Sequence, residues 1–331
     1  MTKKRINKVG FIARIDRGGL AIESQEFVDH FQPDKIMAVK VGDMKHDDKR
    51  FDATVIDGVP SENAIRRFLE GIDVLFSIET FYNPETVRIA REMGVRTVLR
   101  INYEWYEESM RPDLIITPTL YNWENIPDPK IYLPFPINRE VLPFKERKFA
   151  NTFLHIAGNM RAGYDRNGTR TFLDAIPLVK NQNIKFIIKS QVPINGINDK
   201  RVQVICKDYV NYWENWQTDA DVYVSPRRYA GQSLPLNEAM SRGVVPIMPK
   251  ISPQQAFLPD PLLIDVAETD IIKVKTDIEI ATIRPIDIAR KIDELAEQDI
   301  SEYSQICNRI AQAWSWETLL PKYKELFENI C

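Results

Sequence analysis

The segment ADVYVSPRRYAGQSLPLNEAMSRGVVPIM, residues 220–248, predicts a strand, a tight loop, a helix and a second strand in immediate succession. Residues 222–224 are a short β-prone run, and Pro226 and Gly231 mark the turn that follows it. Residues 244–248 supply the second apolar strand. Two strands joined through a helix predict an α/β domain with a parallel sheet.

The helix of this segment should begin near Ser233. Ser233 is a favourable N-cap, Pro235 fits the first turn, and Gly243 suits the position just past the helix end. A small-residue loop that enters a helix start presents backbone N–H groups and the positive end of the helix dipole, which together favour an anion. Gly231 allows close approach of a ligand, and Glu238 lies one turn into the helix, where its carboxylate suits a sugar or ribose hydroxyl. A diphosphate that carries a sugar fits this arrangement.

The segment resembles the C-terminal-domain signature of family 4 glycosyltransferases, which have the GT-B fold and hold a nucleotide sugar with a Glu-x7-Glu loop and helix. Glu238 takes the place of the second Glu, the usual ribose ligand, whereas Ala230 takes the place of the first, the usual ligand of the transferred sugar. The form YAGQSLPLNEA is most similar to a phage and bacterial subgroup with a small residue there. The alternative is an ordinary strand-loop-helix in which Glu238 is a solvated helix residue.

The resemblance implies two doubly wound Rossmann-like domains that face each other across a cleft, with a nucleoside-diphosphate sugar as co-substrate. The expected donor-binding residues are Gly18, Gly19, Gly158, Tyr209, Val210, Arg228, Tyr229, Gly231, Gln232, Ser233, Leu234 and Glu238.

Length and composition agree with a two-domain protein. The chain has 331 residues, 44% of them hydrophobic and 27% charged, with a formal charge of -3 and a pI near 5.8. This composition is typical of a soluble globular protein and gives no global basic surface for nucleic acid. Three cysteines without metal spacing and the absence of an apolar signal core or membrane-length segment predict a cytoplasmic protein.

The first half of the chain alternates between strand and helix patterns. Residues 9–15 form an apolar strand, followed by the Gly18-Gly19 loop and a helix over 21–31, an arrangement similar to the Gly-Gly loop of GT-B enzymes. Further strands are predicted over 36–41, 53–56, 74–78, 97–101, 114–117 and 131–133, with helices over 62–70 and 84–93. The alternation predicts a parallel sheet covered by helices on both faces.

Polar and aromatic residues follow two of these strands, in SIETFY (77–82) and RINYEWY (100–106). At the carboxyl edge of a parallel sheet such groups suit an acceptor pocket, although they can equally be loop residues that satisfy one another. The acceptor-side candidates are Glu79, Tyr82, Asn102, Tyr103 and Glu104. A carboxylate here can act as general base, but the resemblance implies that the donor phosphate takes the acceptor proton.

The segment LPFPIN (133–138) resembles the linker between the two GT-B domains. We predict an acceptor-side domain over 1–145, a nucleotide-sugar domain over 146–312, and a terminal helix over 313–331 that crosses back to the first domain. The second domain should contain strands over 152–157, 184–188, 202–206, 222–224, 244–248, 263–266 and 271–274, and helices from 169, 233, 286 and 301.

The loop after the strand over 152–157 should carry the positive charge for the leaving diphosphate. Where the family has an Arg and a Lys, this chain has Asn159 and Asn167. Because stabilising the leaving group is the largest electrostatic requirement of the reaction, other cations should supply that charge. The candidates are Arg161, Arg166 and Lys189, to act with Glu238, with Arg227 and Arg228 in reserve.

We expect neither a metal site nor a tightly bound cofactor. Asp219-Ala220-Asp221 imitates a metal-binding Asp-x-Asp motif, but it leads into a strand, and the GT-B fold generally needs no bound metal.

The sequence thus favours a retaining, metal-independent glycosyltransferase, either hexosyl- or pentosyltransferase. One alternative acceptor is a hydroxylated base in DNA, which requires a basic groove. Another reading is a non-catalytic or epimerase-like protein that binds a nucleotide sugar. Sugar, nucleotide, acceptor and oligomeric state stay open.

Overall fold

A computed structural model describes residues 7–16, 18–42, 45–158, 160, 163–207, 211–229 and 231–330. The chain divides into two compact units. Unit 1 comprises Met1–Pro136 with Trp316–Cys331, and unit 2 comprises Ile137–Ser315. Each unit is a doubly wound α/β domain, as the alternating pattern predicts.

Unit 1 contains a seven-stranded sheet in the order β3-β2-β1-β4-β5-β6-β7, in which all neighbouring strands are parallel. Its elements are β1 (Val9–Arg14), α1 (Gly19–Phe31), β2 (Lys35–Lys40), β3 (Thr54–Asp57), α2 (Glu62–Leu69), β4 (Val74–Ile78), α3 (Thr86–Glu92), β5 (Arg96–Arg100), β6 (Leu114–Thr117), β7 (Lys130–Tyr132) and α8 (Trp316–Asn329). The strand order reverses between β1 and β4. Ligands of such sheets bind outside the carboxyl ends of the strands at this reversal.

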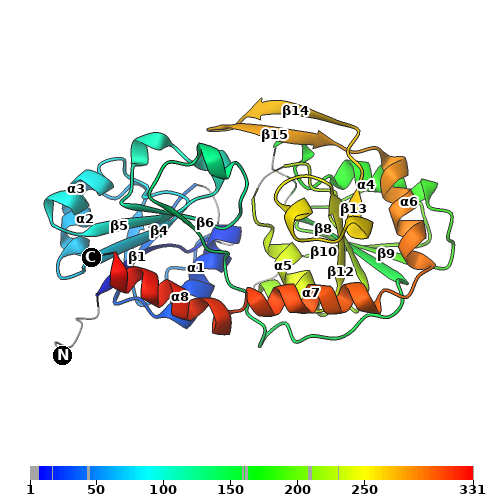
Figure 1. Ribbon diagram of the computed structural model, residues 1–331, viewed down its shortest axis with the longest axis horizontal. Helices are drawn as coiled ribbons and strands as arrows, with labels where there is room; N and C mark the ends of the chain where they lie inside the picture. The colour runs from blue at the N-terminus through cyan, green and yellow to red at the C-terminus, as the bar shows by residue number, and fades with distance from the viewer. Residues whose placement is uncertain are drawn as a thin grey trace. The chain divides into compact units, whose positions relative to one another are not determined.

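Strand β1 is buried on both faces, because successive side chains point to opposite sides of the sheet. Phe11 packs against Phe27 of α1 with 4.7 Å between ring centroids. Gly10 faces the other side, where a Cβ would lie 2.4 Å from Ile72 Cδ1 and 3.2 Å from the Phe68 ring. Helices therefore cover both faces of the sheet (Figure 1).

The C-terminal helix α8 packs on α1 through aromatic contacts. Trp316 stacks on His30 with centroids 4.6 Å apart, and its indole N–H donates to Glu26 Oε2 at 3.0 Å. Tyr323 and Phe327 approach Phe27 at 6.1 and 6.4 Å. These contacts are why the last helix belongs to unit 1.

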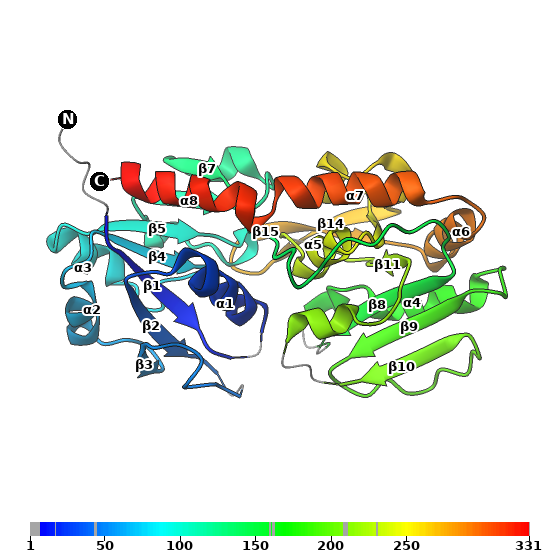
Figure 2. The same ribbon diagram turned by 90° about the horizontal axis from the view of Figure 1, so that it is seen from below.

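Unit 2 contains a six-stranded parallel sheet in the order β10-β9-β8-β11-β12-β13, whose strands β8, β9 and β10 run side by side in Figure 2. Its elements are β8 (Thr152–Gly158), α4 (Thr169–Ala175), β9 (Lys185–Ser190), β10 (Val202–Cys206), β11 (Val222–Val224), α5 (Leu234–Ser241), β12 (Val245–Pro249), β13 (Leu263–Ile264), β14 (Glu268–Lys273), β15 (Asp277–Thr282), α6 (Pro285–Ala296) and α7 (Ser301–Ala313). The strand order reverses between β8 and β11.

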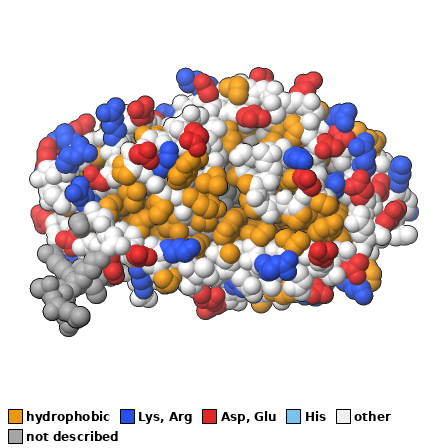
Figure 3. Space-filling view, viewed as in Figure 1, with side chains coloured by type: hydrophobic (Ala, Val, Ile, Leu, Met, Phe, Trp, Pro, Cys, Tyr) orange, Lys and Arg blue, Asp and Glu red, His pale blue; other side chains and the backbone are white. Residues whose placement is uncertain are grey.

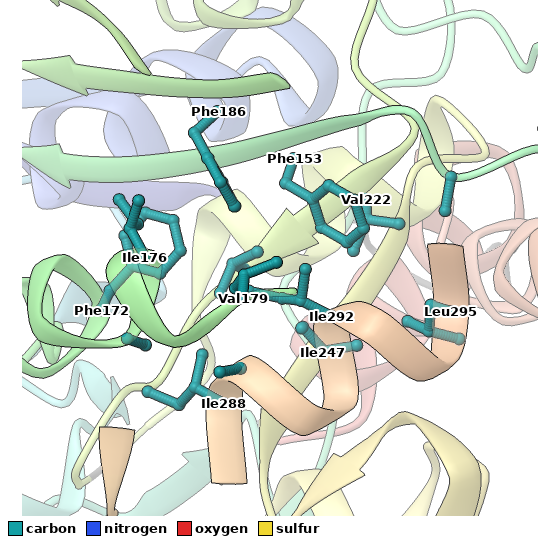
Figure 4. Close-up of a cluster of buried hydrophobic side chains, with 14 of the residues drawn as sticks. Phe153, Phe172, Ile176, Val179, Phe186, Val222, Ile247, Ile288, Ile292 and Leu295 are labelled. Atoms are coloured by element: carbon teal, nitrogen blue, oxygen red, sulfur yellow. The ribbon is translucent and has the colours of Figure 1, made fainter. Parts of the chain in front are cut away.

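The largest core of unit 2 lies between its sheet and the helices α4 and α6. Figure 4 shows Phe153 and Phe186 of the sheet directed toward Phe172, Ile288 and Ile292 of the two helices. All five side chains are almost fully buried. This packing fixes β8, and hence the loop that follows it.

One sequence prediction is wrong in detail. The strand expected over 271–274 is not part of the parallel sheet, since it belongs to β14, which pairs antiparallel with β15 as a separate two-stranded sheet. The second strand of this hairpin was not predicted. The residues of β14 are largely exposed, whereas β15 alternates between exposed residues and the buried Ile278 and Ile280, a strand signal that the sequence interpretation overlooked.

Candidate functional site

The strand reversal of unit 2 brings together two loops, one after β8 and one after β11. Gly168, at the end of the first loop, has φ +66°, and a Cβ there would lie 2.1 Å from the Pro226 carbonyl oxygen of the second loop. A side chain would therefore meet both an unfavourable backbone conformation and a backbone atom. Glycine at 168 allows the two loops to touch.

The helix start predicted in the second loop is confirmed, with one change at its cap. Ser233 occupies the N-cap, Pro235 lies in the first turn, and Gly243 follows the helix with φ +73°. The Ser233 side chain makes no capping hydrogen bond, and it is hydrogen-bonded to the buried Tyr223 instead. The first turn of α5 is thus not closed by its own cap side chain, which suits an anion at this end.

Glu238 is buried rather than solvated, so it is not an ordinary surface residue of a helix. Its Oε2 accepts a hydrogen bond of 2.6 Å from the indole Nε1 of Trp216. Trp216 itself is 2% exposed and packs edge-on against Tyr223 at 5.6 Å. The carboxylate is therefore held in one orientation.

Arg166 and Arg228 play different parts in the contact between the loops. The Arg166 guanidinium lies 5.2 Å from the centre of the Tyr229 ring, a cation–π arrangement. Arg228 donates from Nε to the Ala281 carbonyl at 2.9 Å and from Nη1 to the Tyr164 carbonyl at 2.6 Å. Its guanidinium thus ties the loops to β15, so Arg166 is the better candidate for a diphosphate ligand.

Lys189 ends buried inside unit 2. Its ammonium donates to the carbonyl oxygens of Asn215 at 2.6 Å and Glu214 at 3.5 Å. Burial, and secondarily the positive charge of Lys207, lower its pKa to about 8. These contacts hold the turn that carries Trp216 against β9, so Lys189 supports the Glu238 site through Trp216.

The backbone N–H groups at the start of helix α4 are already hydrogen-bonded within the protein. Asp165 accepts hydrogen bonds from the backbone N–H groups of Thr169 and Arg170 at 3.1 and 3.0 Å. Asn167 donates to the Ala157 carbonyl, and buried His155 bridges the Val224 carbonyl and the Thr169 hydroxyl. A diphosphate near this loop therefore needs cationic side chains rather than the helix dipole.

Several predicted residues lie outside those that the structure describes: Asn159, Arg161, Tyr209, Val210 and Ala230. Of the other predicted donor-binding positions in unit 2, Gly158 ends β8 with φ +65°, and Gly231 lies in the loop between β11 and α5 with φ +56°. Gln232 and Leu234 are partly exposed beside them.

The strand reversal of unit 1 gathers a second group of polar residues. Glu79 follows β4, and its Oε1 accepts a hydrogen bond of 2.9 Å from Asn102, which follows β5. Asn102 Oδ1 in turn accepts from Arg100 Nη1 at 2.9 Å, and Arg100 Nη2 donates to Glu23 Oε1 of α1 at 2.8 Å. Burial raises the pKa of Glu79, and it raises that of Glu23 to about 7.

A neighbouring group joins the ends of β1 and β4. Arg14 Nε donates to Asp16 Oδ2 at 2.6 Å, and its guanidinium is hydrogen-bonded to the Tyr82 hydroxyl. Asp16 Oδ1 accepts from the backbone N–H of Gly18, which precedes the first residue of α1, Gly19. The Gly-Gly loop is thus anchored at this edge of the sheet.

The remaining acceptor-side candidates complete this edge. Tyr103 is partly exposed and packs edge-on against Tyr121 at 5.4 Å, whereas Glu104 is 2% exposed. Glu79 and Tyr82 have φ of +69° and +64°, which is uncommon for residues with side chains and frequent at functional sites.

Sequence reasoning missed Arg14, Asp16, Glu23 and Arg100 at this edge of unit 1, and it missed Trp216 beside Glu238 in unit 2. A signal was present for Arg100, which directly follows the apolar residues Val98 and Leu99 of a buried strand. Glu23 gave no such signal, because the buried side of α1 also carries Ser24 and Glu26.

Within the described ranges, no three His, Cys, Asp or Glu residues are grouped to hold a metal ion. None of the described helices has the length and apolar character that crossing a membrane requires.

Comparisons with known proteins agree with this architecture. Residues 151–272 match the family described as glycosyl transferases group 1. No curated protein matches the sequence. Among solved structures, a glycosyltransferase from Rickettsia africae is 11% identical with a TM-score of 0.66 and 98% of each chain covered.

Two further solved structures cover nearly the whole chain. Anabaena HepE, in complex with UDP and glucose, is 9% identical with a TM-score of 0.69, and 98% of this chain and all of that chain are covered. Sucrose-phosphate synthase from Thermosynechococcus elongatus is 13% identical with a TM-score of 0.64, with 98% and 99% covered. The chain therefore has the GT-B fold, with two Rossmann-like α/β domains and a match to glycosyl transferases group 1 over residues 151–272.

Proposed function

We propose that this protein is a glycosyltransferase that moves a sugar from a nucleoside-diphosphate sugar to an acceptor hydroxyl. The observation that carries the proposal is Glu238, a buried carboxylate oriented by Trp216 at the start of α5, within the segment that matches glycosyl transferases group 1. A carboxylate in this place suits the hydroxyl pair of a ribose. The similarity to HepE, which was solved with UDP and glucose, makes UDP-sugars the first donors to test.

The diphosphate would lie where the loops after β8 and β11 meet. Arg166 supports this placement, because it is partly exposed in that contact and its positive charge is held on the Tyr229 ring. Charge that develops on a leaving diphosphate is stabilised most by cations already fixed in position. Arg161 is assigned to the same role from its place in the sequence.

We infer from the family resemblance that transfer retains the configuration of the sugar and requires no metal. The acceptor oxygen forms a bond to the anomeric carbon on the face that the diphosphate leaves. The bond from that carbon to the diphosphate oxygen breaks with its electron pair, and the acceptor proton passes to the diphosphate. No protein base is required, so Glu79 is free for acceptor recognition.

A DNA acceptor is disfavoured by charge. The chain has a formal charge of -3, and Lys and Arg side chains alternate with Asp and Glu on the face shown in Figure 3. A strongly basic surface, which binding to DNA requires, is absent from that face among the described residues.

The test is product formation. Purified protein is incubated with UDP-glucose, UDP-galactose and UDP-N-acetylglucosamine, with and without a panel of glycosides, and free UDP and glycosylated products are quantified by chromatography and mass spectrometry. Release of UDP that is lost in Glu238→Ala supports the proposal. Binding of a nucleotide sugar with neither hydrolysis nor transfer would instead indicate a non-catalytic protein.

A further inference from the structure

Hydrogen bonds link four side chains of unit 1 in series, from a buried residue at one end to a partly exposed residue at the other. Glu23 on α1 accepts from Arg100 at 2.8 Å, Arg100 donates to Asn102 at 2.9 Å, and Asn102 donates to Glu79 at 2.9 Å. Arg100 is 1% exposed and the Glu23 side chain 5%, so this end of the chain is fixed by burial. Glu79 and Asn102 retain partial exposure, so a ligand can reach them.

The oxygens of the carboxylates are unevenly used. Glu79 Oε1 accepts a hydrogen bond from the Asn102 amide, whereas within the described part of the chain no hydrogen bond is made to Glu79 Oε2. Glu23 Oε2 is buried and also has no hydrogen-bond partner there. Glu23 and Glu79 are close enough for their charges to interact. A partly exposed carboxylate oxygen that has no hydrogen-bond partner among the described residues, here Glu79 Oε2, indicates a place for a ligand that donates hydrogen bonds.

The charges of this edge disfavour an anion. Arg14 is paired with Asp16, and Arg100 is paired with Glu23, so neither guanidinium is available as a dedicated partner for a phosphate or carboxylate. The Glu79 carboxylate is hydrogen-bonded only to a neutral amide among the described residues. Burial and the negative charge of Glu104 raise the pKa of Glu79, whereas the Asn102 hydrogen bond and the positive charges of Arg100 and Arg14 lower it. Among these residues the carboxylates of Asp16, Glu23, Glu79 and Glu104 outnumber the guanidinium groups of Arg14 and Arg100. A negatively charged acceptor would therefore meet a net negative charge in a poorly solvated place.

We propose that Glu79 determines acceptor specificity, and that it selects an uncharged polyhydroxylated acceptor, such as a neutral glycoside, over a phosphorylated or carboxylated one. Glu79 Oε2 accepts a hydrogen bond from an acceptor hydroxyl. Asn102, Arg100 and Glu23 are positioning residues that hold the Glu79 carboxylate. This inference rests on the proposed function and names the acceptor class for it.

The experiment uses pairs of glycosides that differ only in charge. p-Nitrophenyl glucoside is compared with p-nitrophenyl glucuronide, and the galactoside with the galacturonide. Binding is measured by saturation-transfer NMR without a sugar donor, and the acceptor KM is then measured from UDP release with the donor that the protein consumes. We expect each neutral glycoside of a pair that binds to have a KM at least tenfold lower than that of its charged partner.

Glu79→Gln separates recognition from folding. In this variant Asn102 donates a hydrogen bond to the glutamine carbonyl oxygen, and the glutamine NH₂ group then faces the acceptor. An amide NH₂ group cannot accept a hydrogen bond from an acceptor hydroxyl. The KM of the variant for the neutral glycoside should therefore be at least tenfold higher than that of the wild type. The ratio of the KM for the charged glycoside to the KM for the neutral one should fall. The donor KM should stay within twofold of wild type. Glu70→Gln, an exposed change of the same chemistry after α2, is the control and should change neither. Thermal unfolding of both variants checks that they fold.

Stronger binding of the charged member of a pair would overturn the proposal, as would an unchanged acceptor KM in Glu79→Gln. Binding of no glycoside, while the donor is consumed, would also overturn it. If no nucleotide sugar binds, the proposed function fails instead, and the NMR comparison still decides whether this edge selects neutral glycosides.

Discussion

Trp216 Nε1 lies 2.6 Å from Glu238 Oε2 in a buried hydrogen bond between a 3-10 turn (Tyr212–Trp216) and helix α5. The donor is a rigid indole wedged against Tyr223, and the acceptor is the carboxylate assigned to the ribose. Because a carboxylate held in one rotamer loses less conformational freedom on binding, this bond should favour donor affinity.

Trp216→Phe should raise the donor Kd about tenfold, because a hydrogen bond to a charged group contributes about 1.5–3 kcal/mol and part of it is recovered by water. Isothermal titration with UDP measures this change. Trp213→Phe is the control, since Trp213 is in the same turn and contacts Tyr212 instead. An equal loss of affinity in both variants would show that the turn, and not the hydrogen bond, matters.

Arg166→Ala should lower kcat by roughly 10²-fold, with a smaller effect on donor KM, because a fixed cation stabilises the leaving diphosphate mainly as its charge develops. Arg170→Ala, an exposed arginine at the start of α4, serves as the matched control. Steady-state kinetics with the consumed donor decides the matter. Wild-type kcat in both Arg166→Ala and Arg161→Ala would refute the assignment of the diphosphate to this loop.

Gly168→Ala should disturb the contact between the two donor-side loops. The added Cβ would approach the Pro226 carbonyl oxygen to 2.1 Å, and the position also has φ +66°, so we expect a loss of about 1–3 kcal/mol in unfolding free energy and weaker UDP binding. Gly196→Ala provides the control, because Gly196 has φ +83° with no atom within 4 Å of the added Cβ. If the two variants behave alike, the loop contact is not important.

His155 should make unit 2 less stable in mild acid. Burial lowers its pKa to about 4, whereas an unfolded histidine titrates near 6.5, so the stabilisation is complete above pH 6.5 and is lost as the pH falls toward 4. Between pH 7.5 and pH 5 this amounts to about 2 kcal/mol. Urea unfolding at both pH values should show that the free energy of unfolding falls more between pH 7.5 and pH 5 in the wild type than in His155→Gln. The comparison between variants cancels the opposite trend of Glu23, whose raised pKa makes stability fall as the pH rises. Equal acid losses in the two proteins would contradict the assignment.

Both parallel sheets and the loops of the site could be predicted from the sequence, because the hydrophobic periodicity of strands and helices and the residues that form turns are local signals. The strand over 222–224, the helix start at Ser233 and the glycine at 243 are as expected. The partners of the site residues were not predictable, since Trp216 and Glu238 are 22 residues apart and Glu23 and Arg100 are 77 apart. Only the folded sheet brings such residues together.

The Ser233 side chain shows the same limit at short range. Its residue type favours capping, yet its hydroxyl bonds to the buried Tyr223, which is also hydrogen-bonded to Ser225. A contact between two buried hydroxyls cannot be inferred from residue type alone. The hairpin β14–β15 was incompletely predicted for a different reason. The strand β14 is largely exposed and leaves a weak pattern, and the alternation of buried Ile278 and Ile280 in β15 was overlooked.

The most direct test of the account is binding of nucleoside diphosphates and their sugars to the wild-type protein and to Glu238→Ala, followed by thermal unfolding. A ligand that binds only the folded state raises its stability by mass action. We predict that one nucleotide series, with UDP tested first, raises the unfolding temperature of the wild type and raises that of Glu238→Ala much less. An equal rise in both proteins would contradict the role of Glu238, and no rise with any nucleotide would contradict the donor site itself.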